Sequence, residues 1–304
     1  MNKIEKDLLL AVADLHQIPT GAYNIRENGK GIARKCSANI EIKPKQDKPG
    51  IDIIIKPNTK NESVHIPVII TETGLKDVVY NDFYVGENCD VLIVAGCGIH
   101  NPGDQTSQHN GVHAFHIEKN AKVRYVEKHI GVGQKGDKIL NPVTEVYMDN
   151  TSYMLMETTQ LGGVSSAVRT TKANLKDDAK LVIKEKISTN QNQVAKTDFE
   201  VELLGRNSSC EVISRSVTRD ESKQEFKSTL IGKNECFGHV ECDGILIDKS
   251  QIVSTPQIVA ECADATLVHE AAIGKIAGDQ IIKLMSLGLT EKEAEDMIIN
   301  GFLS

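Results

Sequence analysis

The stretch DAKLVIKEKI, residues 178–187, contains the pattern that decides the fold. A turn-forming Asp and a small residue come first, and apolar side chains then return at alternate positions through Leu181, Ile183 and Ile187. Residues two apart share one face of a β-strand, whereas a helix would show a period near 3.6. Branched Val and Ile side chains also favour strands. The stretch therefore predicts a β-strand that is entered through a tight turn.

The same pattern returns about every 30 residues along the chain. It begins with Asn or Asp at Asn88, Asn120, Asn150, Asp178, Asn207, Asn234 and Asp264. Two columns of side chains, three and five positions after each start, are expected to point into one core. The first contains Val91, Val123, Tyr153, Leu181, Cys210, Phe237 and Leu267, and the second contains Ile93, Tyr125, Leu155, Ile183, Val212, His239 and His269. This repeat favours a mainly β protein, a right-handed parallel β-helix or solenoid. An antiparallel sandwich, which also has short strands at regular spacing, is the alternative.

The two ends of the chain have helical patterns. Apolar residues at helical spacing predict an N-terminal helical cap over residues 1–20, and residues 21–272 are expected to form the β-helix core. Residues 273–304 are expected to form a helical hairpin that closes the last turn of the solenoid. Thr290 and Glu293 have the spacing of a capping box at the start of its second helix.

Composition and charge exclude several classes of function. The chain has 304 residues, a formal net charge of -7 and 4% aromatic residues. It has no basic field to attract nucleic acid or an anionic membrane. We expect a cytoplasmic protein, because the first residues show neither a signal peptide nor a membrane span. The seven cysteines are an odd number and widely spread, which favours reduced thiols or metal ligands over disulfides.

Motifs for nucleotide hydrolysis are missing. The glycine-rich stretch GVGQKGDK, residues 131–138, lacks the Gly-Lys-Ser/Thr ending of a phosphate-binding loop. Any ATPase activity that serves this protein is therefore expected in a partner.

One candidate metal group follows from residue spacing alone. The stretch CGIHNPGDQTSQHNGVH contains Cys97 and His100, and His109 and His113, at spacings that zinc or iron can use. Cys89 and His116 lie nearby in the sequence. The alternative is that these histidines are simply exposed on a polar loop.

Three stretches resemble the SufB/SufD family of iron–sulfur cluster assembly proteins. They are HNGVHAFHIEKNAKVRYVEKH at 109–129, GHVECDGILI at 238–247, and the closing segment VHEAAIGKIAGDQIIKLMSLGLTEKEAEDMIINGFL from residue 268. The resemblance extends from about residue 20 to the end of the chain. It implies a right-handed β-helix with helical ends. It also implies a scaffold role, in which transient iron–sulfur clusters are built with a SufC ATPase and passed to recipient apo-proteins.

The resemblance also implies which residues hold the cluster. Cys242 matches the cysteine that the family associates with cluster building, and His269 with Glu270 match a His-Glu pair of SufB-like members. Thiolate is the usual ligand of iron–sulfur clusters, with imidazole or carboxylate as occasional ligands. By strand parity we expect Cys242 and Glu270 to share one face, and His239 and His269 to share the other. The alternatives are a packed cysteine, core histidines and a solvated carboxylate.

Partners and rival functions complete the expectations. The C-terminal helices are expected to dock a SufC-like ATPase, and the scaffold to form a homodimer or a SufB/SufD-type heterodimer. The chain itself is not expected to be an enzyme. One rival is a structural, SufD-like subunit without its own cluster. The other is a carbohydrate-active β-helix enzyme, which low aromatic content disfavours.

Overall fold

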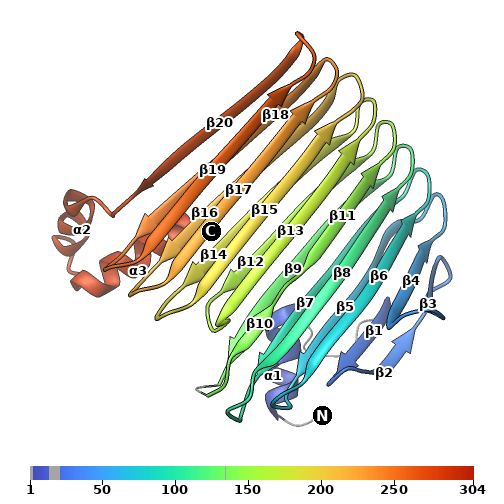
Figure 1. The fold of residues 1–304 in the computed structure, drawn as a ribbon. Helices are drawn as coiled ribbons and strands as arrows, with labels where there is room; N and C mark the ends of the chain where they lie inside the picture. The colour runs from blue at the N-terminus through green and yellow to red at the C-terminus, as the bar shows by residue number, and fades with distance from the viewer. Residues whose placement is uncertain (1–2, 14–20, 134) are drawn as a thin grey trace.

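Each sequence repeat contributes one strand to each of two β-sheets, and successive repeats stack along one axis (Figure 1). The computed structural model describes residues 3–13, 21–133 and 135–304. Sheet A contains, in spatial order, β2 (Lys30–Lys35), β1 (Ala22–Glu27), β5 (Lys60–Ile70), β7 (Asp90–His100), β9 (Lys122–Val132), β12 (Tyr153–Leu161), β14 (Lys180–Thr189), β16 (Ser208–Thr218), β18 (Cys236–Leu246) and β20 (Ala265–Gly274). Sheet B contains β19 (Gln251–Ala260), β17 (Lys223–Gly232), β15 (Val194–Leu203), β13 (Ser166–Leu175), β10 (Lys138–Leu140) with β11 (Val143–Met148), β8 (Ser107–Ile117), β6 (Lys76–Val85), β4 (Gly50–Ile55) and β3 (Ile40–Pro44).

The strands from β5 onward pair in parallel within each sheet. Antiparallel hairpins, β1 with β2 and β3 with β4, occur at the N-terminal end of the sheets. This parallel, in-register pairing confirms the predicted β-solenoid. The alternative prediction, an antiparallel sandwich, is wrong.

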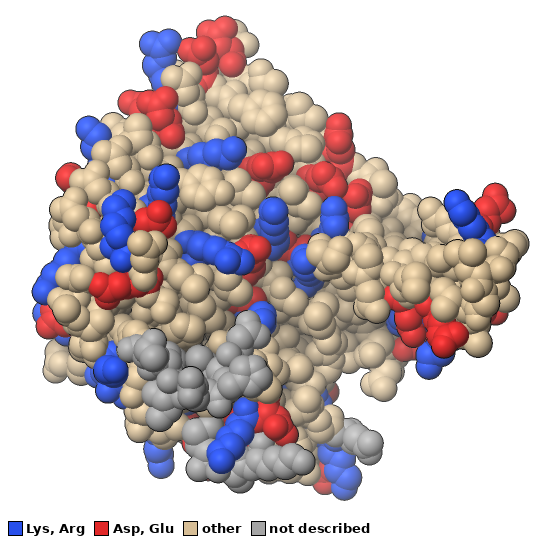
Figure 2. Space-filling view, turned by 180° about the vertical axis from the view of Figure 1, so that it is seen from behind, with Lys and Arg blue, Asp and Glu red and all other residues tan. Residues whose placement is uncertain are grey.

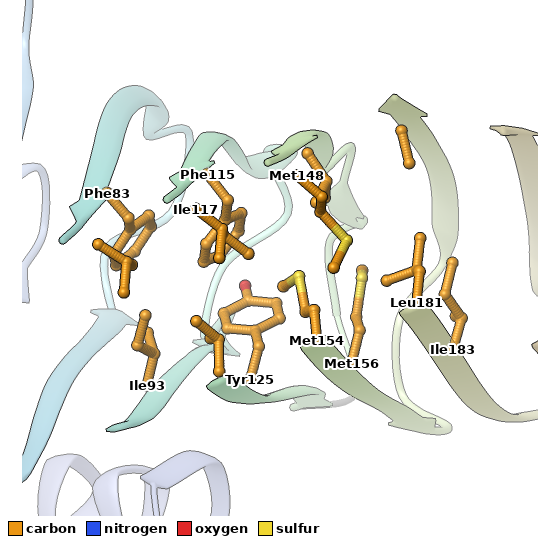
Figure 3. Close-up of a cluster of buried hydrophobic side chains, with 14 of the residues drawn as sticks. Phe83, Ile93, Phe115, Ile117, Tyr125, Met148, Met154, Met156, Leu181 and Ile183 are labelled. Atoms are coloured by element: carbon orange, nitrogen blue, oxygen red, sulfur yellow. The ribbon is translucent and has the colours of Figure 1, made fainter. Parts of the chain in front are cut away.

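Aliphatic and sulfur-containing side chains and a few aromatic rings fill the space between the sheets (Figure 3). Phe83 and Phe115 stack with ring centroids 4.4 Å apart, and Tyr125 meets Phe115 edge to face at 4.9 Å. Farther along, Met154 and Met156 continue the same interior. The low aromatic content therefore reflects a core made of thin repeated layers.

The predicted turn residues form a ladder along the outside of the solenoid. Asn88, Asn120, Asp178 and Asn207 have left-handed backbone conformations, with φ between 54° and 59°. Asn and Asp adopt this region more readily than other side-chain-bearing residues. Asn120 Nδ2 also donates to Asn88 Oδ1 at 3.1 Å, and the hydroxyl of Thr151 donates to Asn120.

Two repeats are out of phase with the expected columns. The left-handed residue of the third repeat is Thr151, not Asn150, and Met154 rather than Tyr153 pairs with Val123. In the sixth repeat Gly238 pairs with Cys210, so Phe237 is 48% exposed. One extra residue in a turn sends every side chain of the following strand to the opposite face, until the next turn restores the phase. The expected inward positions of Tyr153, Leu155, Phe237 and His239 are therefore wrong.

The N-terminal helix lies on a flank of the solenoid. α1 (Lys3–Ala13) packs on the outer face of sheet A, where Leu8 and Val12 are buried. A Cβ at Gly98 would lie 2.9 Å from Leu8 Cδ2, so glycine permits this close approach. The expected end of the helical segment, residues 14–20, lies outside the described residues.

The C-terminal helices form the expected hairpin but do not cover the last turn. α2 (Gly278–Met285) contacts α3 (Glu291–Phe302), and Thr290 and Glu293 form the predicted capping box. Val253 and Ile258 of β19 remain 53% and 43% exposed. The prediction that the hairpin closes the solenoid is therefore wrong. Among the described residues, no helix is long and apolar enough to cross a membrane.

Replacing Asn120 tests the turn ladder. Asn120→Ala should lower the free energy of unfolding by about 1–2 kcal/mol, because it removes the side-chain bonds and leaves a Cβ in a left-handed conformation. Asn120→Gly loses the same bonds but relieves the backbone, so it should cost less than Ala. Urea denaturation measures both variants. Equal losses for Ala and Gly would contradict a contribution from backbone strain.

Candidate functional site

The four residues singled out near the C-terminus lie on β18 and β20, the last two strands of sheet A. Val240 pairs with His269, Glu241 with Glu270, and Cys242 with Ala271. Because neighbouring residues of a strand point to opposite faces, Cys242 shares the interior face with His269. His239 shares the outer face with Glu270. The predicted pairing of Cys242 with Glu270 is wrong, since the sixth repeat is shifted by one residue.

The inner pair combines a buried thiol with an imidazole. Cys242 is fully buried, and this burial raises the pKa of its thiol to about 11, although the Ser254 hydroxyl acts in the other direction. Burial and then the neighbouring His239 lower the pKa of His269. The Nε2 atom of His269 is buried and has no hydrogen-bond partner among the described residues. A neutral imidazole with a free nitrogen is the form that binds metal.

The outer pair faces solvent. His239 Nε2 lies 3.6 Å from Glu270 Oε2, which is an ion-pair distance when the imidazole is protonated. The Glu270 side chain is 67% exposed, whereas that of His239 is 21% exposed. Imidazole and carboxylate are both ligands for iron.

The sheet separates the two pairs, which lie beside a free edge. β20 is the last strand of sheet A, so its outer edge has no strand partner among the described residues. Within those residues no cluster of three or more His, Cys, Asp or Glu is arranged to hold a metal ion. One chain therefore presents two partial ligand sets near one edge.

The second predicted group converges in part. Cys97, His109 and His113 line one interior cavity of about 10 Å³, which has space for roughly one water. His109 Nδ1 lies 3.0 Å from Asp77 Oδ2, and His113 Nδ1 lies 2.8 Å from the Tyr125 hydroxyl. His100 ends β7 and does not line this cavity. Residues 107–111 of the expected polar loop belong to β8, and His109 and His113 are buried rather than exposed.

A buried ionic network beside this cavity was not anticipated from the sequence. Arg169 Nη1 lies 2.5 Å from Glu127 Oε2, and Arg169 Nε lies 3.6 Å from Glu185 Oε1. Glu185 also accepts hydrogen bonds of 3.0 Å from Thr197 and Ser214. Strand parity could have indicated that these carboxylates point inward. Glu127 lies two residues after Tyr125, and Glu185 lies two residues after Ile183, so each shares the face of a residue in the inward column.

The surroundings set the ionisation of this network. Burial alone would raise the pKa of Glu127, but Arg169 and His129 outweigh burial and hold the pKa well below its usual range. Burial prevails at Glu185 and raises its pKa, although Arg169 opposes it. A buried charge of this kind persists only with a partner.

The fold and its open end define a class of protein, a β-solenoid with thiol, imidazole and carboxylate side chains gathered near one free sheet edge. The chain belongs to the SufB/SufD family, since the family model described as "SUF system FeS cluster assembly, SufBD core domain" matches residues 78–302. The description of this family concerns iron–sulfur cluster assembly, so it gives no support to the carbohydrate-active alternative.

Curated relatives carry the same family name. An iron–sulfur cluster assembly SufBD family protein homolog of Methanothermobacter thermautotrophicus is 30% identical over 244 residues, which cover 78% of this chain and 58% of the relative. A SufBD family protein of Methanocaldococcus jannaschii is 28% identical over 269 residues, covering 87% of this chain and 84% of the relative. One from Archaeoglobus fulgidus is 30% identical, with 75% of this chain and 61% of the relative covered. The chain thus spans less than two thirds of the length of several relatives.

The buried His113 predicts a loss of stability in mild acid. Burial lowers the pKa of His113 to about 4, whereas an unfolded imidazole titrates near 6.5. Between these values the unfolded chain binds the additional proton, so the free energy of unfolding should fall by about 2 kcal/mol between pH 7 and pH 5. In His113→Gln this part of the pH dependence should disappear. Urea denaturation at several pH values measures the slope.

His116→Gln, on the outer face of the same strand, is the matched control and should keep the wild-type slope. His113→Gln also removes the hydrogen bond to Tyr125, which lowers stability at every pH. The dependence of the unfolding free energy on pH, rather than its absolute value, is therefore the quantity to compare. A wild-type slope in His113→Gln would contradict the assignment.

Proposed function

We propose that the chain is a scaffold on which iron–sulfur clusters are assembled and from which they pass to recipient apo-proteins. The observation that carries the proposal is the gathering of Cys242, His239, His269 and Glu270 on the last two strands of sheet A. Family membership supplies the cargo, and the side chains supply suitable ligand types. The cluster is transient cargo in this proposal.

The chemistry of the inner and outer pairs supports a cluster site whose ligand set forms only when iron binds. Cys242 is protonated near neutral pH because burial raises its thiol pKa, so iron binding must displace that proton. The resulting thiolate loses its desolvation penalty only when a cation arrives. His269 offers an unoccupied buried nitrogen on the same face. His239 and Glu270 remain accessible on the other face for incoming iron.

A second scaffold subunit would complete the ligand set at the sheet edge. β19 and β20 end their sheets, and the exposed apolar residues Val253, Ile258 and Ile273 lie on these strands. Free strand edges with apolar side chains favour pairing with another chain. We therefore propose a dimer through this end, either a homodimer or a SufB/SufD-type heterodimer, with ligands from both subunits.

The C-terminal helices are the proposed docking surface for a SufC-like ATPase. Ile282 and Leu287 are 65% and 76% exposed, and α2 has no buried residue. α3 is fixed to the solenoid, because Arg219 lies 2.6 Å from Glu295 and 3.2 Å from Asp296. An anchored hairpin with an exposed apolar side can transmit movement of the ATPase to the adjacent end of sheet A.

A structural, SufD-like role is the second candidate. The absence of a ready-made metal group among the described side chains favours it. Glu270 favours the cluster-bearing role, because it supplies a carboxylate beside His239. The two candidates differ in whether the chain binds iron and sulfide.

Removing the Cys242 thiol tests the proposed site. The wild-type protein, reconstituted anaerobically with iron and sulfide, should develop charge-transfer absorption and elute as a dimer with bound iron. In Cys242→Ala the absorption and iron content should fall by more than about half, since thiolate is the principal cluster ligand. Absorption spectra, iron and sulfide analysis and light scattering measure the outcome.

Cys210→Ala is the matched control, because Cys210 is also a buried interior thiol of sheet A, one strand away. This variant should retain the wild-type cluster content. Wild-type cluster content in Cys242→Ala would remove Cys242 from the site. A wild-type protein that binds no cluster would favour the SufD-like role, and a monomer with a full cluster would contradict a shared site.

Polar substitutions on α2 and in the turn after it test ATPase docking. Ile282→Ser combined with Leu287→Ser should reduce the amount of a SufC-like ATPase retained in a pull-down by about tenfold, because apolar contact area is lost. Leu161→Ser, at a comparably exposed residue of β12, is the control and should retain the ATPase. Equal retention by the wild type and the Ile282/Leu287 double variant would move the docking surface elsewhere.

A further inference from the structure

A groove of about 700 Å³ crosses the outer face of sheet A. Its floor runs from β5, which contributes His65, to β16, and its lining includes Ala13 of α1 and Ser304 after α3. Five strand spacings make this floor roughly 24 Å wide. The volume falls within the usual range for small-molecule sites, about 300–1,000 Å³. It is the outer face of the sheet, so the groove is distinct from the interior cavity and from Cys242.

The lining of the groove is strongly basic. Its positively charged residues are Arg124, Lys128, Lys184, Lys186 and Arg215, and its acidic lining residues are Glu157 and the inward-facing Glu185. The whole chain has a formal net charge of -7, so this concentration of cations runs against the overall balance. Figure 2 shows Lys and Arg side chains across the middle of one face, interspersed with Asp and Glu and beside the projecting C-terminal helices.

Strand register places three of these cations in one row. Lys128 pairs with Thr159, Thr159 with Lys186, and Lys186 with Arg215. Lys186 and Arg215 are therefore direct neighbours, about 4.8 Å apart along the sheet. Like charges at neighbouring positions destabilise a sheet unless counter-charges offset them. The row is a place where a bound anion would be stabilised.

Two of the lysines have no anionic partner within the described residues. No hydrogen bond or ion pair joins Lys184 or Lys186 to another described side chain, whereas Arg124 is occupied by Glu157 at 2.7 Å. Arg215 donates one hydrogen bond to the Phe302 carbonyl at 3.0 Å, its guanidinium carbon lies 5.8 Å from the centroid of the Phe302 ring, and the residue lines the groove. Lys184 and Lys186 are thus the cations with the most capacity for a ligand.

An apolar strip lies beside the basic row. Leu92, Val94 and Val126 line the part of the groove nearest α1, and Ile213 lines the part nearest Arg215. A ligand that suits both strips has a multiply charged anionic part and a flat or apolar part. An acidic peptide would satisfy the cations but would leave the enclosed apolar strip without a matching group.

We propose that this groove binds a nucleotide-sized ligand through its phosphate chain, with Lys184, Lys186 and Arg215 as the phosphate contacts. The apolar strip receives the base or another planar group. Phosphate oxygens accept charge-assisted hydrogen bonds from Lys and Arg, and the bidentate guanidinium adds orientation. The inference goes beyond the scaffold role and does not depend on it. It concerns binding only, since the groove has no glycine-rich phosphate loop.

Calorimetric titration of the full chain alone tests the proposal. ADP, inorganic pyrophosphate and adenosine are titrated separately at low salt in the presence of EDTA. ADP should bind with a dissociation constant below about 1 mM, pyrophosphate should compete with it, and adenosine should bind more weakly because it lacks phosphate. Raising the salt concentration should weaken ADP binding.

Charge-removing variants locate the site. Lys184→Gln combined with Lys186→Gln should weaken ADP binding by at least about tenfold, because two phosphate contacts are lost. Lys223→Gln combined with Lys249→Gln removes the same charge outside the groove and should leave affinity within about twofold. Both changes are at surface positions, and circular dichroism checks that each variant folds.

Three results would overturn the proposal. The first is no binding of ADP or pyrophosphate to the wild type at millimolar concentration. The second is an equal loss of affinity in the two double variants, which would indicate a general charge effect. The third is displacement of ADP by a poly-glutamate peptide that binds more tightly, which would identify a surface for acidic proteins instead.

Discussion

In-register parallel pairing along the solenoid axis is the constraint on which the rest of the structure depends. The register of each strand with its neighbour determines which of its side chains point into the interior. A side chain in one repeat can therefore contact only the side chains at matching positions of the adjacent repeats. The interior column of sheet A runs from Glu127 through Thr158, Glu185 and Ser214 to Cys242. The candidate ligands, the ionic network and the basic groove are all products of this single register.

Much of the fold was predictable from the sequence because its signals are local. The turn residues Asn88 and Asn120 favour left-handed backbone, and alternating apolar residues mark the strands. The position of α1 was not predictable, since an amphipathic helix can pack on an end or on a flank. Small residues of β7, such as Gly98, select the flank, and their role appears only when the helix is placed against them.

The candidate site was predictable in its members but not in its geometry. Resemblance identified Cys242, His269 and Glu270, and the structure places them on adjacent strands. Parity assigned the wrong partners, because the turn before β18 has one residue more than the alignment by Asn234 assumed. The length of a turn is a weak signal in one sequence, yet it exchanges the two faces of every residue in the strand that follows it. The buried pair of Glu127 and Arg169 depends on contacts between residues 42 apart, which sequence spacing alone does not reveal.

The last coil of the solenoid, formed by β19 and β20, is not covered by the C-terminal helices, and this affects its local stability. In a stacked array each coil is stabilised by its neighbours on both sides, but the last coil has one neighbour and partly exposed apolar residues. We expect β19 and β20 to separate from the array at lower energetic cost than any interior coil, as terminal repeats fray first. Cys242 lies directly behind that coil. Local separation of β19 and β20 would thus expose the sulfur atom of Cys242, which is shielded completely from water while these strands are paired.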